Sequence, residues 1–249
     1  MKTNIDSLMM AYDAGVEEEL IRLSVKPEGR AEFEVICSML DKFISPNAVV
    51  YDIGAGPGRY AEYLLNKACR VAAIDISEKS LKAFKQRING HFKENMLFSR
   101  QCCATQLQWL ESHSADAILL MGPLYHLVDE DERKSTLAHC WRLLKPDGIL
   151  FSVFMNILTE KDNILSNQQF TEVDFQGYRI QQYRCKPAFA EKMLNNHGFT
   201  TEKLICLDNG LDTEVVDYHS FLSELLINGE ESTLLNECCQ FLHIGRKNN

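Results

Sequence analysis

The sequence predicts an α/β fold, a doubly wound Rossmann-like sheet with helices on both faces, and three observations support this. Short apolar runs of strand length alternate with amphipathic helical stretches. A glycine-rich turn, Gly54-Ala55-Gly56-Pro57-Gly58, joins the first of these runs to a helix. The length of 249 residues and the 45% of hydrophobic residues suit one large domain with additions.

The predicted elements begin with helices over the first 45 residues, where apolar residues recur at helical spacing. Pro27-Glu28-Gly29 is expected to separate two of these helices. Buried strands are predicted at 48–53, 71–76, 115–121 and 149–154, with a weak strand within 97–107. Helices are predicted at 59–67, 78–88 (capped by Ser77), 129–144, 187–197 and about 213–237, and further strands at 199–207 and 240–247.

Composition restricts the function classes. The net charge of −9 and the pI near 5.3 argue against nucleic acid as a partner, because such binders cluster Lys and Arg. No apolar run reaches the length of a membrane span, so we expect no membrane partner. The nine cysteines contain no C-x-x-C pair and follow no signal peptide, which predicts reduced thiols in the cytoplasm. The histidines show no metal-like clustering, and Glu17-Glu18-Glu19 is interpreted as a solvated face.

The glycine turn is the segment most informative about chemistry. Glycines allow left-handed backbone angles and a close approach of a ligand, and the following helix start offers unpaired N–H groups. Asp75 ends the next strand, 75 − 54 = 21 residues after Gly54, where a carboxylate accepts the ribose hydroxyls of an adenosine group. The alternatives are a tight turn without a ligand and an Asp75 that only caps the following helix. We favour the ligand because the glycines and the spaced acid occur together.

At these residues the chain resembles the class I S-adenosylmethionine-dependent methyltransferases. Asp52, Gly54, Gly56 and Gly58 match the family's D-x-G-x-G-x-G motif, and the segments 115–120 and 143–150 resemble its fourth strand and its L-K-P-G-G-x-L turn. The segment Met121-Gly122-Pro123-Leu124-Tyr125-His126-Leu127 is similar to the G-P-L-Y-H-L turn of a bacterial subset. The resemblance implies a seven-stranded sheet whose last strand is antiparallel, and S-adenosyl-L-methionine as the cofactor.

The resemblance also implies the site residues. Asp75 holds the ribose, and Arg22 pairs with the methionine carboxylate unless it only forms a Glu–Arg pair on a helix face. Cys103 stands where the family often has an acid facing the adenine amino group. The implied cofactor-binding residues are Tyr12, Arg22, Asp52, Gly54, Ala55, Gly56, Asp75, Ile76, Cys103, Ala104, Met121 and Gly122.

Catalytic residues are sought after the fourth strand, at the carboxyl edge where open α/β sheets bind ligands. Tyr125 and His126 are the candidates, with His126 as a general base near neutral pH. An equally supported alternative is a histidine that packs against a helix and bonds a backbone carbonyl.

The domain organisation predicted is an N-terminal helical cap over 1–45 and a methyltransferase domain over 46–249. A polar insertion at 157–185 carries Phe170, Phe175, Tyr178 and Tyr183 and is expected to cover the acceptor site. A plain edge hairpin or a dimer contact is the alternative.

The function predicted is methyl transfer to an O or N nucleophile of a small-molecule acceptor, by a cytoplasmic monomer or homodimer. The alternatives are an RNA or protein methyltransferase and a non-catalytic binder of S-adenosylmethionine. A nicotinamide oxidoreductase is disfavoured because its fingerprint spaces the third glycine one residue later.

Overall fold

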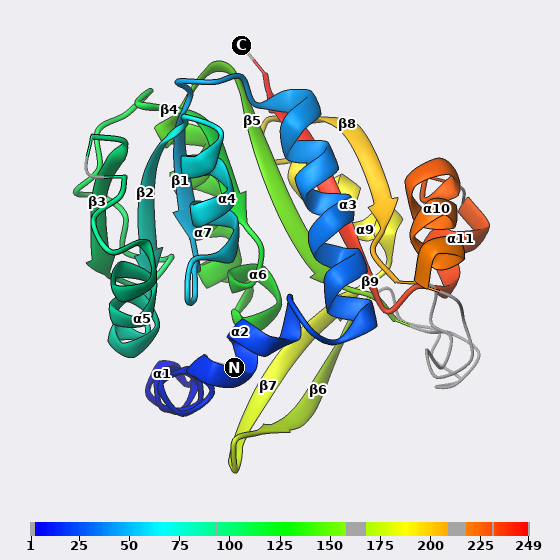
Figure 1. Cartoon of the computed structure of the whole chain (residues 1–249). Helices are drawn as coiled ribbons and strands as arrows, with labels where there is room; N and C mark the ends of the chain where they lie inside the picture. Colours follow the sequence, from blue (N-terminus) through cyan, green and yellow to red (C-terminus); the bar gives the residue numbers. More distant parts are fainter. Residues whose placement is uncertain (1–2, 93, 158–167, 209–217, 231, 249) are drawn as a thin grey trace.

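A nine-stranded sheet forms the middle layer of the structure, a computed structural model that describes residues 3–92, 94–157, 168–208, 218–230 and 232–248 (Figure 1). Five parallel strands lie in the order β3 (Met96–Gln101), β2 (Arg70–Asp75), β1 (Val49–Ile53), β4 (Ala115–Leu120), β5 (Leu144–Met155). The last strand, β9 (Gln240–Lys247), runs antiparallel between β5 and β8 (Phe199–Cys206). The doubly wound sheet and its antiparallel last strand are therefore confirmed.

Helices cover both faces of this sheet. In Figure 1, α3 (Pro27–Phe43) and α4 (Arg59–Asn66) lie in front of the sheet, and α7 (Glu130–Leu143) and α9 (Pro187–Asn195) lie behind it. The central strands are almost fully buried between these layers, which explains their continuous apolar runs. Among the described residues after β1, the other helices are α5 (Glu78–Ile88), α6 (Pro123–His126), α10 (Tyr218–Asn228) and α11 (Ser232–Glu237). Ser77 caps α5 as predicted. The predicted helical residues 213–217 lie outside the described residues.

The first three helices differ from the prediction at one point. The chain turns between α2 (Val16–Arg22) and α3 at residues 23–26, so the expected break at Pro27-Glu28-Gly29 is wrong. Pro27 begins α3, because its missing N–H costs nothing at the first helical position. Gly29 lies within that first turn, where a Cβ would come within 1.9 Å of the Arg22 carbonyl oxygen. The glycine therefore permits α2 and α3 to pack closely.

The insertion forms a β-hairpin in its described part, which raises the strand number from the expected seven to nine. It consists of β6 (Gln168–Phe175) and β7 (Tyr178–Cys185), and residues 158–167 lie outside the described residues. β5 continues past Ser152, the last residue paired with β4, and its end pairs with β7 at Met155 and Arg184. The hairpin thus extends the sheet, and its expected role as a cover of the acceptor site stays a prediction.

The hairpin also packs against α1 (Ile5–Ala14). Leu8 and Ala11 of α1 and Ile180 of β7 form a small hydrophobic cluster that is separate from the main core. Figure 1 shows α1, α2 and the hairpin together at the lower edge, where the arrows of the central strands end. α3 differs from these two helices because Val35, Ile36 and Leu40 belong to the main core. None of the described helices is long and apolar enough to cross a membrane.

Candidate functional site

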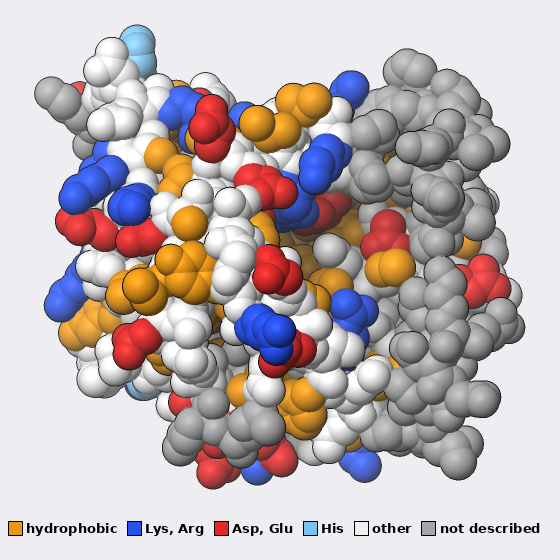
Figure 2. Space-filling model, turned by 90° about the horizontal axis from the view of Figure 1, so that it is seen from below, with side chains coloured by type: hydrophobic (Ala, Val, Ile, Leu, Met, Phe, Trp, Pro, Cys, Tyr) orange, Lys and Arg blue, Asp and Glu red, His pale blue; other side chains and the backbone are white. Residues whose placement is uncertain are grey.

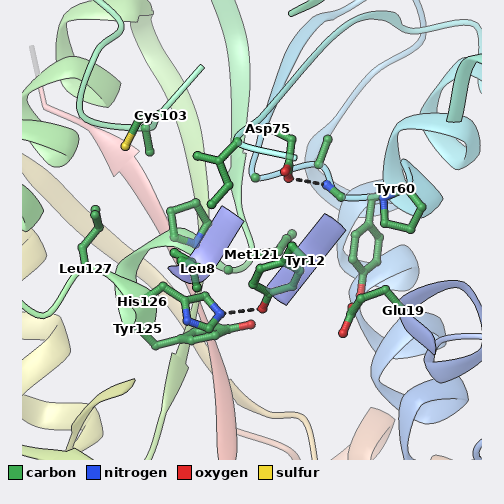
Figure 3. A pocket seen from close by; sticks show the side chains of 18 of the residues that line it. Leu8, Tyr12, Glu19, Tyr60, Asp75, Cys103, Met121, Tyr125, His126 and Leu127 are labelled. Carbon is green, nitrogen blue, oxygen red and sulfur yellow. Dashed lines mark hydrogen bonds between the residues drawn. The ribbon is translucent and has the colours of Figure 1, made fainter. Parts of the chain in front are cut away.

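A cavity lies at the carboxyl edge of the parallel strands, under α1 (Figure 3). It holds about 930 Å³ of space free of protein atoms, a figure that includes its open mouth. All but one of the predicted site residues line it, namely Tyr12, Arg22, Gly54, Ala55, Gly56, Asp75, Ile76, Cys103, Ala104, Met121, Gly122, Tyr125 and His126. The structure therefore brings these predicted site residues together in one cavity.

The glycine turn between β1 and α4 forms one wall of the cavity. Gly58 has φ +76° at the start of α4, and a Cβ there would lie 2.3 Å from the Phe84 ring. Gly56 has φ +53°, and a Cβ built on it would meet nothing within 4 Å. The open space at Gly56 is the cavity itself, so the backbone can approach a ligand here as the motif predicts.

Asp75 is held by two backbone N–H groups. Its Oδ2 accepts from Gly56 N and its Oδ1 from Ser77 N, both at 2.7 Å. A carboxylate offers about four lone-pair sites, so about two remain for a ligand. Burial raises the pKa of Asp75 to about 6, although the two N–H groups act in the opposite direction.

Asp52 is the predicted site residue that does not line the cavity. Its side chain is 1% exposed, and its Oδ2 has no hydrogen-bond partner among the described residues. Burial, together with repulsion from Asp75, raises the pKa of Asp52 to about 7, while a hydrogen bond from the Ala61 backbone lowers it. Asp52 is therefore buried in the protein and does not contribute to the lining of the cavity.

Charged side chains gather where α2 and α4 border the cavity. The Arg22 guanidinium donates to Glu32 Oε2 at 2.5 Å and to Glu19 Oε2 at 3.2 Å. The Tyr60 hydroxyl donates to Glu32 Oε1 at 3.4 Å. The Glu–Arg pair that was the alternative for Arg22 is therefore present, although Arg22 also lines the cavity.

Several cavity residues were missed by the sequence prediction. Glu19 lines the cavity, so the interpretation of Glu17-Glu18-Glu19 as a solvated face is wrong for this residue. Arg59 and Tyr60 also line it, and their position directly after the glycine turn is the signal that would have found them. The Arg59 guanidinium lies over the Phe33 ring, 4.9 Å from its centroid.

Tyr12, Tyr125 and His126 meet on the side of the cavity nearest α1 (Figure 3). Tyr12 Oη and His126 Nε2 share a hydrogen bond of 2.6 Å, and His126 Nδ1 has no partner among the described residues. Burial lowers the pKa of His126 to about 3, so its imidazole is neutral at physiological pH. Burial raises the pKa of Tyr12 and of Tyr125, so both phenols are also neutral.

The end of the cavity at Cys103 is less polar than the end at Glu19. Figure 3 shows Cys103 on one side of the cavity and Tyr60 and Glu19 on the other. The Cys103 thiol accepts a hydrogen bond from Thr105 Oγ1 at 3.2 Å. The segment directly after β3 contributes Cys102, Cys103 and Ala104 to the described lining of the cavity, and no carboxylate.

Comparisons with known proteins bear on this site. Residues 51–152 match a family model described as a methyltransferase domain. The carboxy-S-adenosyl-L-methionine synthase of Shewanella loihica is 27% identical over 152 residues, which cover 59% of this chain and 58% of that enzyme. The enzyme of the same name from Shewanella baltica is 24% identical over 202 residues, covering 76% of this chain and 79% of the enzyme.

A solved structure supports the fold over almost the whole chain. The 1,6-didemethyltoxoflavin-N1-methyltransferase of Burkholderia thailandensis, solved with 1,6-didemethyltoxoflavin and S-adenosylhomocysteine, superposes with a TM-score of 0.64 at 19% identity. The match covers 98% of this chain and 88% of that one. This likeness shows the fold of the chain. Residues 51–152 are similar to a methyltransferase domain.

The cavity fits S-adenosylmethionine, the cofactor that the sequence resemblance implies, on two observations. The space that a Cβ at Gly56 would enter is open. It adjoins the buried Asp75 carboxylate, which has about two lone pairs left to accept hydrogen bonds from a ligand. The cavity also carries opposite charges at one end, at Glu19 and Arg22, and the less polar residues Cys102, Cys103 and Ala104 at the other, as an amino-acid group and an adenine require. No cluster of metal-ligating side chains occurs in the part of the chain that the structure describes.

Proposed function

We propose that this chain transfers a methyl group from S-adenosylmethionine to an oxygen or nitrogen nucleophile of a small molecule. The observation that carries the proposal is the Asp75 carboxylate beside the open Gly56 turn, with the Tyr12–His126 pair facing the same cavity. The methyltransferase domain and the cofactor fit support the chemistry. The acceptor class rests on the site's enclosed position under α1 and the net charge of −9.

The binding roles follow from the two ends of the cavity. Asp75 accepts the ribose hydroxyls, and the backbone of Cys103 and Ala104 borders the adenine. Arg22 and Arg59 are assigned to the methionine carboxylate. Arg22 is already shared by Glu19 and Glu32, whereas Arg59 Nε has no partner among the described residues. Of the two carboxylates beside Arg22, Glu19 lines the cavity and is suited to the methionine ammonium group.

The catalytic contribution of the chain is mainly alignment and exclusion of water. S-adenosylmethionine, when bound, supplies an electrophilic methyl group on a sulfonium. Tyr125 and His126 border the cavity after β4, where they restrict the direction from which an acceptor approaches. His126 carries a free lone pair or N–H at Nδ1, but a pKa of about 3 makes it a weak base. An acceptor that loses its proton readily is therefore favoured.

Synthesis of carboxy-S-adenosyl-L-methionine is a second candidate function, because proteins of that name align with 59–84% of this chain. In that case S-adenosylmethionine itself is the molecule modified. Location in the cytoplasm is proposed from the nine cysteines, all of which carry free thiols. A monomer or homodimer stays the predicted assembly.

One experiment separates these functions. The full chain is incubated with S-adenosylmethionine and pools of candidate metabolites, and the products are analysed by mass spectrometry. Adenosylhomocysteine together with a product heavier by one methyl group supports the proposal, whereas carboxylated S-adenosylmethionine supports the second candidate. Asp75→Ala serves as the control in which cofactor binding is weakened. Calorimetric binding of NAD without binding of adenosylhomocysteine would overturn both candidates.

A further inference from the structure

A second pocket adjoins the cofactor cavity, between the first turn of α1 and the β6–β7 hairpin. The two spaces share Leu8 and His126 as walls. Figure 2 looks onto the lower face of the molecule, the side on which α1 and the hairpin lie in Figure 1. A molecule in the second pocket is therefore separated from the cofactor cavity by two side chains.

The rim of this pocket is suited to a negative group. Arg179 lines it with a side chain that is 80% exposed, and the ion pair of its guanidinium with Glu172 is long, at 3.5 Å. Such an exposed pair contributes little and is readily exchanged for a ligand carboxylate. The N-terminal end of α1, with its cap Asn4 and with Ser7, lies on the same rim and presents the positive end of the helix dipole.

The floor of the pocket gives a second, independent indication of a ligand. Leu8 and Ile180 are buried apolar residues there, and both belong to the small cluster between α1 and the hairpin. His126 lines the same floor, is 5% exposed and leaves Nδ1 without a partner among the described residues. A buried polar atom without a partner is costly, so a ligand group that pairs with it gains affinity.

We propose that this pocket anchors the methyl acceptor, and that the acceptor is a small molecule with an apolar body and a carboxylate. The carboxylate binds Arg179 and the start of α1, and the body lies over Leu8 and Ile180. The nucleophilic end then passes His126 toward the cofactor cavity. The role of the ligand as a methyl acceptor rests on the proposed methyl transfer, whereas the carboxylate site itself is testable by binding alone.

The test uses benzoate as the probe and benzamide as its neutral match, titrated calorimetrically into the full chain saturated with adenosylhomocysteine. Saturation fills the cofactor cavity, so the probe's carboxylate reports on another site. Arg179→Gln should weaken benzoate about 5–10-fold, because it removes a charge-assisted hydrogen bond. Glu172→Gln should strengthen benzoate about 2–3-fold, because Arg179 loses its competing carboxylate. Both residues are exposed, so neither variant is expected to disturb folding.

The opposite signs of the two variants decide the outcome. Benzoate binding that exceeds benzamide binding and shifts in both directions supports the carboxylate site. Equal binding of the two probes, no detectable benzoate binding, or benzoate binding that ignores both substitutions overturns it. Failure of adenosylhomocysteine to bind in the saturation step would instead count against the proposed function, and the benzoate titrations would still judge the pocket.

Discussion

The two walls of the cofactor cavity are stabilised by different parts of the molecule. The glycine turn and Asp75 follow β1 and β2, whose residues are buried in the main core. The opposite wall is α1, which packs on the hairpin through a small cluster that is separate from the main core and has Leu8, Ala11 and Ile180 at its centre. The first wall is thus fixed by the fold, whereas the second is free to vary with the ligand.

The largest expected effect is a loss of stability at Gly58 of the first wall, compared with Gly177 of the hairpin that supports the second wall. Gly58 and Gly177 have nearly the same φ, +76° and +77°, but a Cβ at Gly58 would lie 2.3 Å from Phe84 and one at Gly177 would meet nothing within 4 Å. Gly58→Ala should therefore lower the free energy of unfolding by about 2–4 kcal/mol, from strain and overpacking. Gly177→Ala should lower it by only about 1 kcal/mol, from strain alone. Urea unfolding of both variants measures the difference, and equal losses would show that the first wall is not tightly packed.

A second prediction compares carboxylates from the two walls by calorimetry with adenosylhomocysteine. Asp75→Ala should weaken binding at least about 30-fold, because two hydrogen bonds to a charged group are lost. Asp13 of α1 accepts from Ser77 Oγ at 2.6 Å and does not line the cavity, so Asp13→Ala is the matched control with a few-fold effect. A loss at Asp13 as large as that at Asp75 would remove the assigned ribose role.

The same carboxylate gives binding a pH dependence. Asp75 accepts hydrogen bonds from hydroxyls best when ionised, and its pKa is raised to about 6 by burial. Affinity for adenosylhomocysteine should therefore fall as the pH drops through about 6 in the natural chain and stay level in Asp75→Asn.

The smallest expected effect concerns Asp52, which lies behind the first wall. Its folded pKa of about 7 exceeds its ordinary value, so its contribution to stability is present at low pH and is lost as pH rises through 7. Asp52→Asn is neutral throughout. Its free energy of unfolding, relative to the natural chain, should therefore rise by about 1–3 kcal/mol between about pH 5 and about pH 8.

Chemical unfolding at several pH values tests this. His126 and His243 have folded pKa values lowered by burial to about 3 and about 4, so their stabilisation is lost as pH falls. They act equally in both proteins and cancel in the difference. A difference that does not change with pH would mean that Asp52 holds no extra proton in the folded state.

The first wall could be predicted from sequence because its determinants are local. A strand, a glycine turn and a helix follow one another within residues 49–66, and Asp75 ends the neighbouring strand. The second wall depends on contacts between distant segments, such as the Tyr12 and Phe175 rings with centroids 5.2 Å apart. No periodicity encodes that contact. Likewise, Glu32 reaches Arg22 only through the packing of α3, and Asp52 matches a motif although its side chain faces the protein interior.

β5 extends beyond the end of β4, and this extension has a consequence for how such enzymes diversify. A strand end without a neighbour on one side presents free N–H and C=O groups, and any added strand finds a ready docking place there. In this chain Asn156 secures the base of the addition, since its Nδ2 donates to the carbonyls of Leu235 and Cys238 at 2.9 Å. The segment between Asn156 and Pro187 is therefore an exchangeable module: grafting another hairpin at these two points should alter what the cavity admits while the doubly wound core stays as it is.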